Sequence, residues 1–257
     1  IVYNNPNTAR GGVRMGRVIV VTSGKGGTGK TTTVAALSSC LAALGHRTLA
    51  VDCDAGLRNL DVSLGMSEFI VADISDVTEG RLGLEDAVRE HPDIPNLFFI
   101  SAPARLSPTQ LLPEGAVRMF RDAAERFEYV LADSPAGLGA GFRLAACAAD
   151  GAIVVTPGDK ASIRGAGRTV ETLLAMGISD VRLLINRLDG RSARKLGITA
   201  DDVIDLTGAR LIGIIRESEG VTMAAADETP LILHSRGGAA RDFLDTARRV
   251  RGEDVPI

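Results

Sequence analysis

The stretch SGKGGTGKTT, residues 23–32, decides how this chain of 257 residues folds. It fits the phosphate-loop pattern of glycine, any four residues, glycine, lysine and then serine or threonine. The β-branched run Val18–Val21 directly before it predicts a buried parallel strand, and apolar residues at helical spacing after it predict a helix. Strand, glycine-rich turn and helix N-terminus therefore follow one another in the order that a polyphosphate site requires.

The residue types of this loop suit the binding of a nucleotide. Glycines let successive backbone N–H groups close on a polyphosphate, and the helix dipole adds partial positive charge there. Lys30 is expected to meet the β- and γ-phosphates, and the Thr31 hydroxyl to ligate Mg²⁺. The alternative is a glycine-rich turn without a ligand. The predicted nucleotide-binding residues are Gly24, Lys25, Gly26, Gly27, Thr28, Gly29, Lys30, Thr31 and Thr32.

A second lysine, Lys25, lies inside the glycine run, where a general nucleotide site needs only one cation. Its alternative role is a solvated loop charge. The run KGGTGKT, residues 25–31, resembles the signature KGGxGKT of the deviant-Walker-A ATPases. In that family the first lysine reaches phosphates bound by the other subunit of a nucleotide-sandwich dimer. The resemblance thus implies ATP and Mg²⁺ as cofactors, an ATP-dependent homodimer, and catalytic roles for Lys25 and Lys30.

Aspartates follow two further apolar runs that read as strands, residues 48–52 and 129–133. The carboxyl ends of parallel strands are where such sheets bind ligands. Beside a phosphate loop, Asp54 is expected to orient the attacking water, while Asp52 and Asp133 are expected to hold the Mg²⁺ shell. The alternative for each is a turn-forming or helix-capping residue.

Three short segments resemble the MinD group of cell-division ATPases: DAGLRNLD at 54–61, DSPAG at 133–137 and DKASIR at 159–164. The resemblance implies a role in placing the division septum, a MinC-like inhibitor and a topological regulator as partners. It also implies that Asn186, at the end of an apolar run, hydrogen-bonds the adenine; the alternative is a loop-capping asparagine. The segment RESE, residues 216–219, departs from the group, which usually has a proline there.

Strands and helices alternate along the whole chain, without an internal repeat or a low-complexity linker. Further strands are expected at 97–100, 151–157, 181–187 and 211–215, a weak helix at 84–90, and helices from residue 113 and over 239–250. Val117 is expected on the core face of the helix from residue 113, and Leu174 is expected to pack, with Val170 and Leu173, on a helix after residue 164. This order predicts an α/β fold with a doubly wound, mostly parallel sheet and helices on both faces, the three-layer arrangement of P-loop NTPases. We expect a single ATPase domain over residues 15–257, and a disordered leader or expression remnant over 1–14.

The composition is 45% hydrophobic and 24% charged, with a net charge of −3, which argues against bulk nucleic-acid binding. The sequence holds no run of about 18 apolar residues, so no transmembrane helix is expected. Its three cysteines show no CxxC spacing and favour a reducing cytosol. The resemblance adds peripheral association with the cytoplasmic face of the membrane, although the basic amphipathic helix that usually closes MinD sequences is not evident before Ile257.

Three other functions stay open at this stage. A DNA-partitioning or flagellar-positioning ATPase would share the fold and would bind duplex DNA in a salt-sensitive way. A non-hydrolysing nucleotide sensor would bind ATP without releasing phosphate. An iron–sulfur ATPase would need cysteines near residues 137–141, where the sequence has none.

Overall fold

The computed structural model describes residues 15–55, 57–104, 113–189 and 199–257. Within these residues, eight strands form one sheet in the order β3-β4-β2-β5-β1-β6-β7-β8. Neighbouring strands run parallel, apart from β3 and β4, which are antiparallel. The strands are β1 (Arg17–Thr22), β2 (Thr48–Asp52), β3 (Arg89–Glu90), β4 (Leu97–Ile100), β5 (Tyr129–Asp133), β6 (Gly151–Thr156), β7 (Asp180–Leu188) and β8 (Arg210–Arg216).

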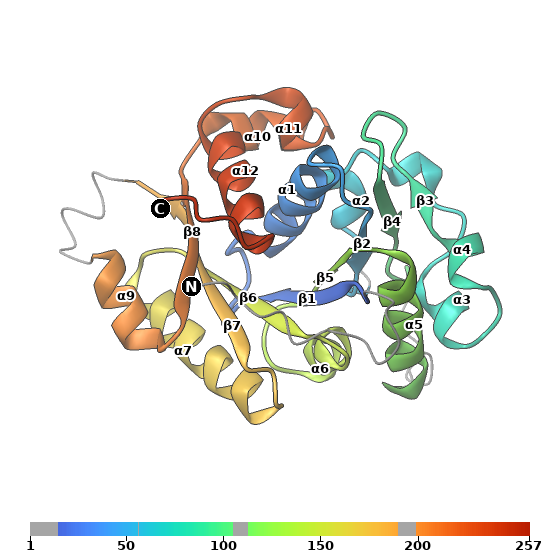
Figure 1. The fold of residues 1–257 in the computed structure, drawn as a ribbon, viewed down its shortest axis with the longest axis horizontal. Helices are drawn as coiled ribbons and strands as arrows, with labels where there is room; N and C mark the ends of the chain where they lie inside the picture. Colours follow the sequence, from blue (N-terminus) through green and yellow to red (C-terminus); the bar gives the residue numbers. More distant parts are fainter. Residues whose placement is uncertain (1–14, 56, 105–112, 190–198) are drawn as a thin grey trace.

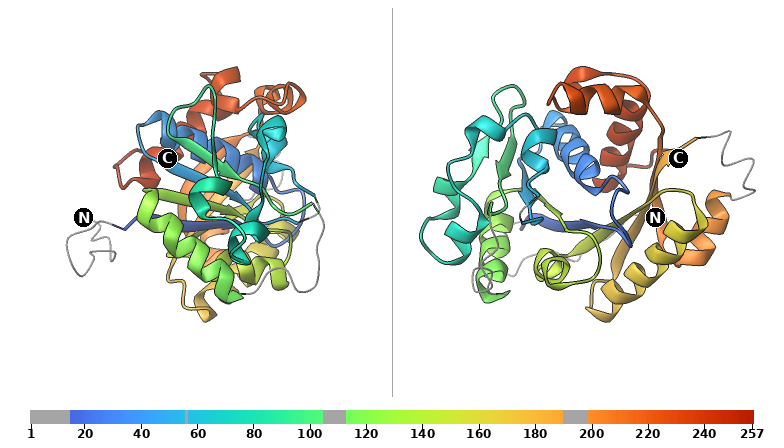
Figure 2. Two further views of the ribbon diagram at one scale, coloured as in Figure 1. Left: turned by 90° about the vertical axis from the view of Figure 1, so that its right-hand side faces the viewer. Right: turned by 180° about the vertical axis from the view of Figure 1, so that it is seen from behind.

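Helices cover both faces of this sheet, as Figures 1 and 2 show. One layer contains α3 (Ile74–Thr78), α4 (Leu84–Ala87), α5 (Pro113–Arg126), α6 (Ala140–Ala146), α7 (Lys160–Ala175) and α9 (Ala200–Thr207). The other contains α1 (Lys30–Ala43), α2 (Leu60–Ser63), α10 (Glu219–Ala226), α11 (Leu231–His234) and α12 (Ala239–Val250). The 3₁₀ turn η1 (Ser67–Phe69) follows α2. The predicted doubly wound, three-layer α/β fold is confirmed.

The central strand β1 shows why the sheet needs both layers. Val18 and Val20 pack into the cluster on one face, and Ile19 and Val21 pack into the cluster on the other. Side chains alternate between the two faces of a strand, so an unbroken apolar run leaves both faces to be covered. The phosphate-loop stretch therefore starts at the end of a strand buried in the middle of the molecule.

Helix α1 is buried almost all round because it lies between the sheet and α12 (Figure 1). Its hydroxyl side chains are buried too, and they donate to main-chain carbonyls of the preceding turn. Ser38 donates to Val34 at 2.7 Å, and Ser39 donates to Ala35 at 2.7 Å. The small serine side chains let α12 pack close to α1. The hydrogen bonds within α1 offset the cost of burying the serine hydroxyl oxygens.

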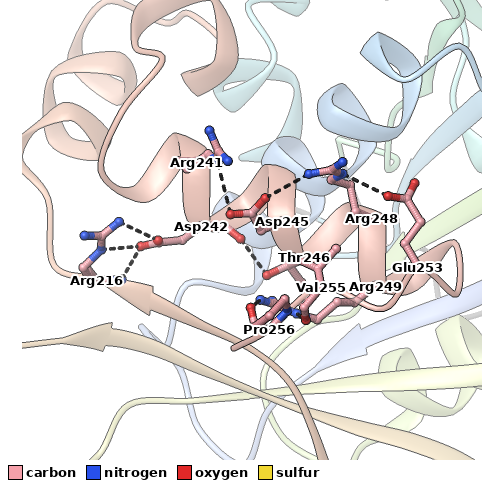
Figure 3. A network of polar contacts seen from close by, with 10 residues as sticks. All are labelled: Arg216, Arg241, Asp242, Asp245, Thr246, Arg248, Arg249, Glu253, Val255 and Pro256. Atoms are coloured by element: carbon pink, nitrogen blue, oxygen red, sulfur yellow. Dashed lines mark hydrogen bonds and ion pairs between the residues drawn. The ribbon is translucent and has the colours of Figure 1, made fainter.

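Arginine side chains link helix α12 to β8 and to the residues that follow α12 in the chain (Figure 3). Arg216 of β8 meets Asp242 at 2.8 Å. Arg249 donates to the carbonyl oxygens of Ile212 at 3.2 Å and Val255 at 2.8 Å, and also to that of Pro256. The structure thus gives the arginine-rich end of this helix specific partners. Among the described residues, no helix is both long and apolar enough to cross a membrane.

Several local expectations differ from the structure. Val117 is only half-buried, whereas Met119 on the same helix is buried in the core cluster. Leu174, expected in the core, is 50% exposed. Residues 89 and 90 form β3 instead of extending a helix, because they pair with Phe98 and Phe99 of β4. Residues 1–14, the expected leader, lie outside the described residues.

Candidate active site

The loop between β1 and α1 has the backbone that its glycines allow. Gly27 and Gly29 have φ angles of 74° and 93°, in the left-handed region that favours glycine. The Ser23 hydroxyl donates to the carbonyl oxygen of Lys25 at 2.7 Å and tightens the turn. Gly29 is the N-cap of α1 and supplies no side-chain acceptor, and the first turn contains no acidic residue. The helix N-terminus is thus left for an external anion.

Two neighbouring elements hold this loop in place. A Cβ added to Gly24 would lie 2.4 Å from the backbone carbon of Gly165 in α7, so the loop and the helix touch through their main chains. On the other side, Nδ2 of Asn186 in β7 donates to the carbonyl oxygen of Thr28 at 2.8 Å. A Cβ on Gly29 would lie 2.2 Å from that same nitrogen. Glycine is therefore required by contacts at positions 24 and 29, and at position 29 also by its φ of 93°.

The two lysines of the loop have different surroundings. Lys30 is only 7% exposed, and its charge acts on the carboxylates of Asp54 and Asp133. The side chain of Lys25 is 50% exposed, and its Nζ lies 3.6 Å from Oδ2 of Asp159 at the start of α7. Lys30 is thus part of the buried centre of the site, whereas Lys25 lies on its outer surface.

Asp52 and Asp133 lie next to each other, in register at the ends of β2 and β5. Both are fully buried. Burial raises the pKa of Asp52 to about 7 and that of Asp133 to about 8, in the second case against a hydrogen bond from Thr31. Oδ1 of Asp133 has no hydrogen-bond partner in the described protein. A cation bound between these two neighbouring carboxylates would stabilise their ionised forms, which burial otherwise disfavours.

Asp54 lies in the segment that leaves β2. Its N–H donates to Oδ1 of Asp52 at 2.8 Å, and its own side chain is half-buried. Burial raises the pKa of Asp54, and Lys30 opposes the rise. Arg58 follows with a φ of 47° and an ion pair to Asp61 at 3.6 Å. Gly56, within the same segment, lies outside the described residues.

The donor set fits Mg²⁺ bound together with a nucleotide. Among the described residues, no group of three or more His, Cys, Asp or Glu side chains could hold a metal alone. Mg²⁺ is usually bound by one or two carboxylates plus substrate phosphates, and the neighbouring Asp52 and Asp133 match the carboxylate part of such a ligand set. Two buried oxygens without partners, Oγ1 of Thr28 and Oδ1 of Asp133, come from the loop and from the neighbouring strand end. The loop, Thr31 and the paired aspartates thus define a P-loop nucleoside triphosphatase site.

Comparisons with known proteins place the chain within this class. Residues 19–231 match the CobQ/CobB/MinD/ParA nucleotide-binding domain. The septum site-determining protein MinD of Thermotoga maritima is 35% identical over 95% of this chain and 91% of its own length. Among solved structures, the MinC:MinD cell division complex of Aquifex aeolicus is 34% identical, covers 94% of this chain and 98% of the other, and has a TM-score of 0.86.

A MinD structure from Pyrococcus horikoshii, described as complexed with Mg-ADP, is 27% identical, with a TM-score of 0.81 and coverage of 92% and 96%. The chain belongs to the CobQ/CobB/MinD/ParA family and, within it, to the MinD group. It is a Mg²⁺-dependent, MinD-like ATPase that acts in division-site placement.

The structure brings most of the predicted site residues together. Lys30, Asp52, Asp54 and Asp133 form one cluster of ionisable side chains, and Thr31 is hydrogen-bonded to Asp133. Asn186 reaches the loop through Thr28, and its contact with adenine stays a prediction. Asp159 and Gly165 also lie beside the loop, and neither was predicted as its neighbour from the sequence. Asp159 could have been suspected from its N-cap position three residues before Ser162; Gly165 gives no sequence signal.

Proposed function

We propose that ATP binding drives two copies of this protein to pair face to face, and that hydrolysis separates them. Lys25 of each copy then reaches the phosphates held by its twin. The observation that carries this proposal is the difference between the lysines: Lys30 is buried beside Asp54 and Asp133, whereas Lys25 is half-exposed on the outer surface of the same loop. A cation held outside its own site is available to a neighbouring molecule.

The roles of the remaining residues follow from their places. Asp54 orients the water that attacks the γ-phosphorus in line; the bond from that phosphorus to the bridging oxygen breaks, and ADP leaves with the electron pair. Thr31, Asp52 and Asp133 would hold Mg²⁺, which neutralises charge on the β- and γ-phosphate oxygens when it is bound. Residues 24–32 bind the phosphates, and Asn186 contacts the adenine.

Two exposed leucines support closure over this surface. Leu57 is 66% exposed and follows Asp54 in the segment after β2, and Leu138 is 36% exposed and follows Asp133 at the end of β5. Contact with a partner would remove the apolar surface of these two side chains from water. The proposed partners are a second copy of this chain, a MinC-like inhibitor and a topological regulator. The MinC:MinD structure of the relative supports the second of these.

The proposed location is the cytoplasm, with peripheral association at the cytoplasmic face of the membrane. ATP-dependent sedimentation with anionic vesicles tests this association. The same assay with duplex DNA at low salt tests the DNA-partitioning alternative.

Sedimentation and phosphate release test the switch itself. With Mg²⁺ and ATP, the protein is expected to sediment as a dimer and to release phosphate slowly; with ADP it is expected to be a monomer. Turnover per subunit should rise with protein concentration, because pairing completes the site. A monomer with constant turnover at all concentrations contradicts the proposal.

A further inference from the structure

The carboxylate that faces Lys25 is rigidly held. Asp159 is the N-cap of α7 and accepts hydrogen bonds from the N–H groups of Ala161 at 3.1 Å and Ser162 at 3.0 Å. Its second oxygen accepts from the Ser162 hydroxyl at 2.5 Å. Burial opposes its ionisation, but the hydrogen bonds from Ser162 and the charge of Lys25 outweigh this and lower the pKa of Asp159. Asp159 is thus a fixed negative charge at neutral pH.

The backbone next to Lys25 is fixed as well. Gly24 packs directly on the main chain of Gly165, one turn into α7, so the loop cannot move closer to the helix at this point. Of the two charged groups, only the Lys25 side chain has freedom to move, because the Asp159 oxygens are bound to the helix end. The ion pair of 3.6 Å therefore restrains one long, half-exposed side chain against a rigid surface.

We propose that Asp159 is a positioning residue that keeps Lys25 on its own subunit and so raises the concentration at which ATP-bound copies pair. This inference rests on the proposed function, since it assumes that Lys25 acts across a dimer. To reach the phosphates of a twin, the Lys25 ammonium must leave Asp159. A symmetric dimer breaks two such pairs, so their contribution enters the pairing equilibrium twice.

The size of the effect follows from exposure. Exposed ion pairs are weak, so the loss of both pairs is expected to tighten ATP-dependent dimerisation only about two- to thirtyfold. The Lys25–Asp159 pair thus biases the equilibrium and does not block it. This increase in dimer affinity should become smaller as salt is added, because salt screens the interaction between exposed charges.

The test uses Asp159→Asn in the full chain. Asparagine caps helices about as well as aspartate, so α7 keeps its cap while the charge is removed. The dimer dissociation constant is measured by sedimentation with Mg²⁺ and a slowly hydrolysed ATP analogue, at low and high salt. We expect tighter pairing at low salt, a smaller gain at high salt, and unchanged nucleotide affinity of the monomer.

Two further variants separate positioning from simple structural effects. Asp73→Asn is the matched control, because Asp73 caps α3 and accepts from Ser75 N–H and hydroxyl at 2.8 and 2.5 Å; its pairing should equal that of wild type. In a Lys25→Ala background, Asp159→Asn should change nothing, since the restrained cation is gone. Equal melting temperatures for Asp159→Asn and wild type show that α7 is intact.

Each outcome decides the matter. If Asp159→Asn pairs no more tightly than wild type, or pairs more tightly even without Lys25, Asp159 does not restrain the lysine. The proposed function still stands in that case, provided that wild type pairs with ATP. If wild type itself fails to pair with ATP, the proposed function is wrong and this inference is wrong with it.

Discussion

Asp52 and Asp133 are register partners at the ends of two adjacent parallel strands, and neither carboxylate is exposed to solvent. Asp52 accepts hydrogen bonds from the N–H groups of Asp54 and Leu60 at 2.8 and 3.4 Å. Asp133 keeps one oxygen without a partner. The pair joins the segment that carries Asp54 to the phosphate loop, so a cation and a triphosphate bound here would be felt directly in that segment.

Replacing Asp133 by Asn should separate stability from activity. The change keeps the shape of the side chain and removes a buried charge that lacks a full set of partners. Without nucleotide, we expect the variant to be about 1–2 kcal/mol more stable than wild type at pH 8, as measured by urea unfolding. Turnover with Mg²⁺ and ATP should fall at least about 100-fold. A marked loss of stability together with normal turnover contradicts the assignment of Asp133 as a Mg²⁺ ligand.

Replacing Asn186 by Ala tests its two roles at once. Loss of the hydrogen bond to Thr28 should loosen the loop and weaken binding of both ATP and tripolyphosphate, by about 1 kcal/mol. Loss of a contact with adenine should further weaken the binding of ATP but not that of tripolyphosphate. Competition binding with the two ligands measures both terms. Equal affinities of variant and wild type for both ligands would exclude each role.

The contact between Gly24 and Gly165 predicts a sharp difference between two alanine substitutions. Gly24→Ala places a methyl group 2.4 Å from the α7 backbone, so it should destabilise the fold by about 1–3 kcal/mol and weaken nucleotide binding. Gly139→Ala is the control, because Gly139 has a φ of −77° and no atom within 4 Å of an added Cβ. Thermal melting of both variants checks this; equal melting temperatures would show that α7 does not support the loop.

His91 predicts a pH dependence of stability. Its Nδ1 accepts the N–H groups of Asp93 and Ile94 at 3.0 and 3.1 Å, so the proton lies on Nε2, which donates to the Leu64 carbonyl at 2.9 Å. Burial lowers the pKa of His91 below its usual value, against the hydrogen bond to Leu64. Below about pH 6.5 the unfolded chain therefore binds a proton that the folded protein resists, and stability falls as the pH falls.

The measurement is urea unfolding of wild type and His91→Gln at pH 7.5 and pH 5.5. Wild type should lose up to about 1.4 kcal/mol more than the variant over this range, because glutamine does not titrate. The same loss in both proteins would show that His91 is protonated without cost in the folded state.

The strands of the centre could be predicted from sequence because buried parallel strands carry unbroken apolar runs. The runs that end at Asp52 and Asp133 end as strands at those same residues. The phosphate loop could be predicted because phosphate binding requires its glycines, lysine and threonine at fixed positions in the sequence. The doubly wound class of the fold could be predicted from the alternation of these strands with helices, whereas the order of the strands in the sheet was not predicted.

Other features depend on contacts between distant segments. Gly24 meets Gly165, and Thr28 meets Asn186, across more than a hundred residues, and no local pattern encodes these approaches. The two-residue strand β3 exists only because β4 offers it an edge. Leu174 has the spacing of a core residue, yet its place on α7 leaves it half-exposed. Local sequence therefore predicts whether a segment forms a helix or a strand better than it predicts which other segments that element contacts.

The central claim is that Lys25 acts on the nucleotide of its twin, and mixing two inactive variants tests it most directly. Lys25→Ala keeps Asp54 but lacks the lysine, and Asp54→Ala keeps the lysine but lacks the residue that orients water. In a mixed dimer the first variant's ATP meets its own Asp54 and the second variant's Lys25, so one complete site forms.

Phosphate release is measured for each variant alone and for an equimolar mixture. We predict almost no turnover from either alone and recovery of about a quarter of the wild-type rate on mixing, since about half of the dimers are mixed and each has one complete site. If Lys25 acted on its own nucleotide, no mixed dimer would hold a complete site. A mixture as inactive as its components would therefore contradict the account.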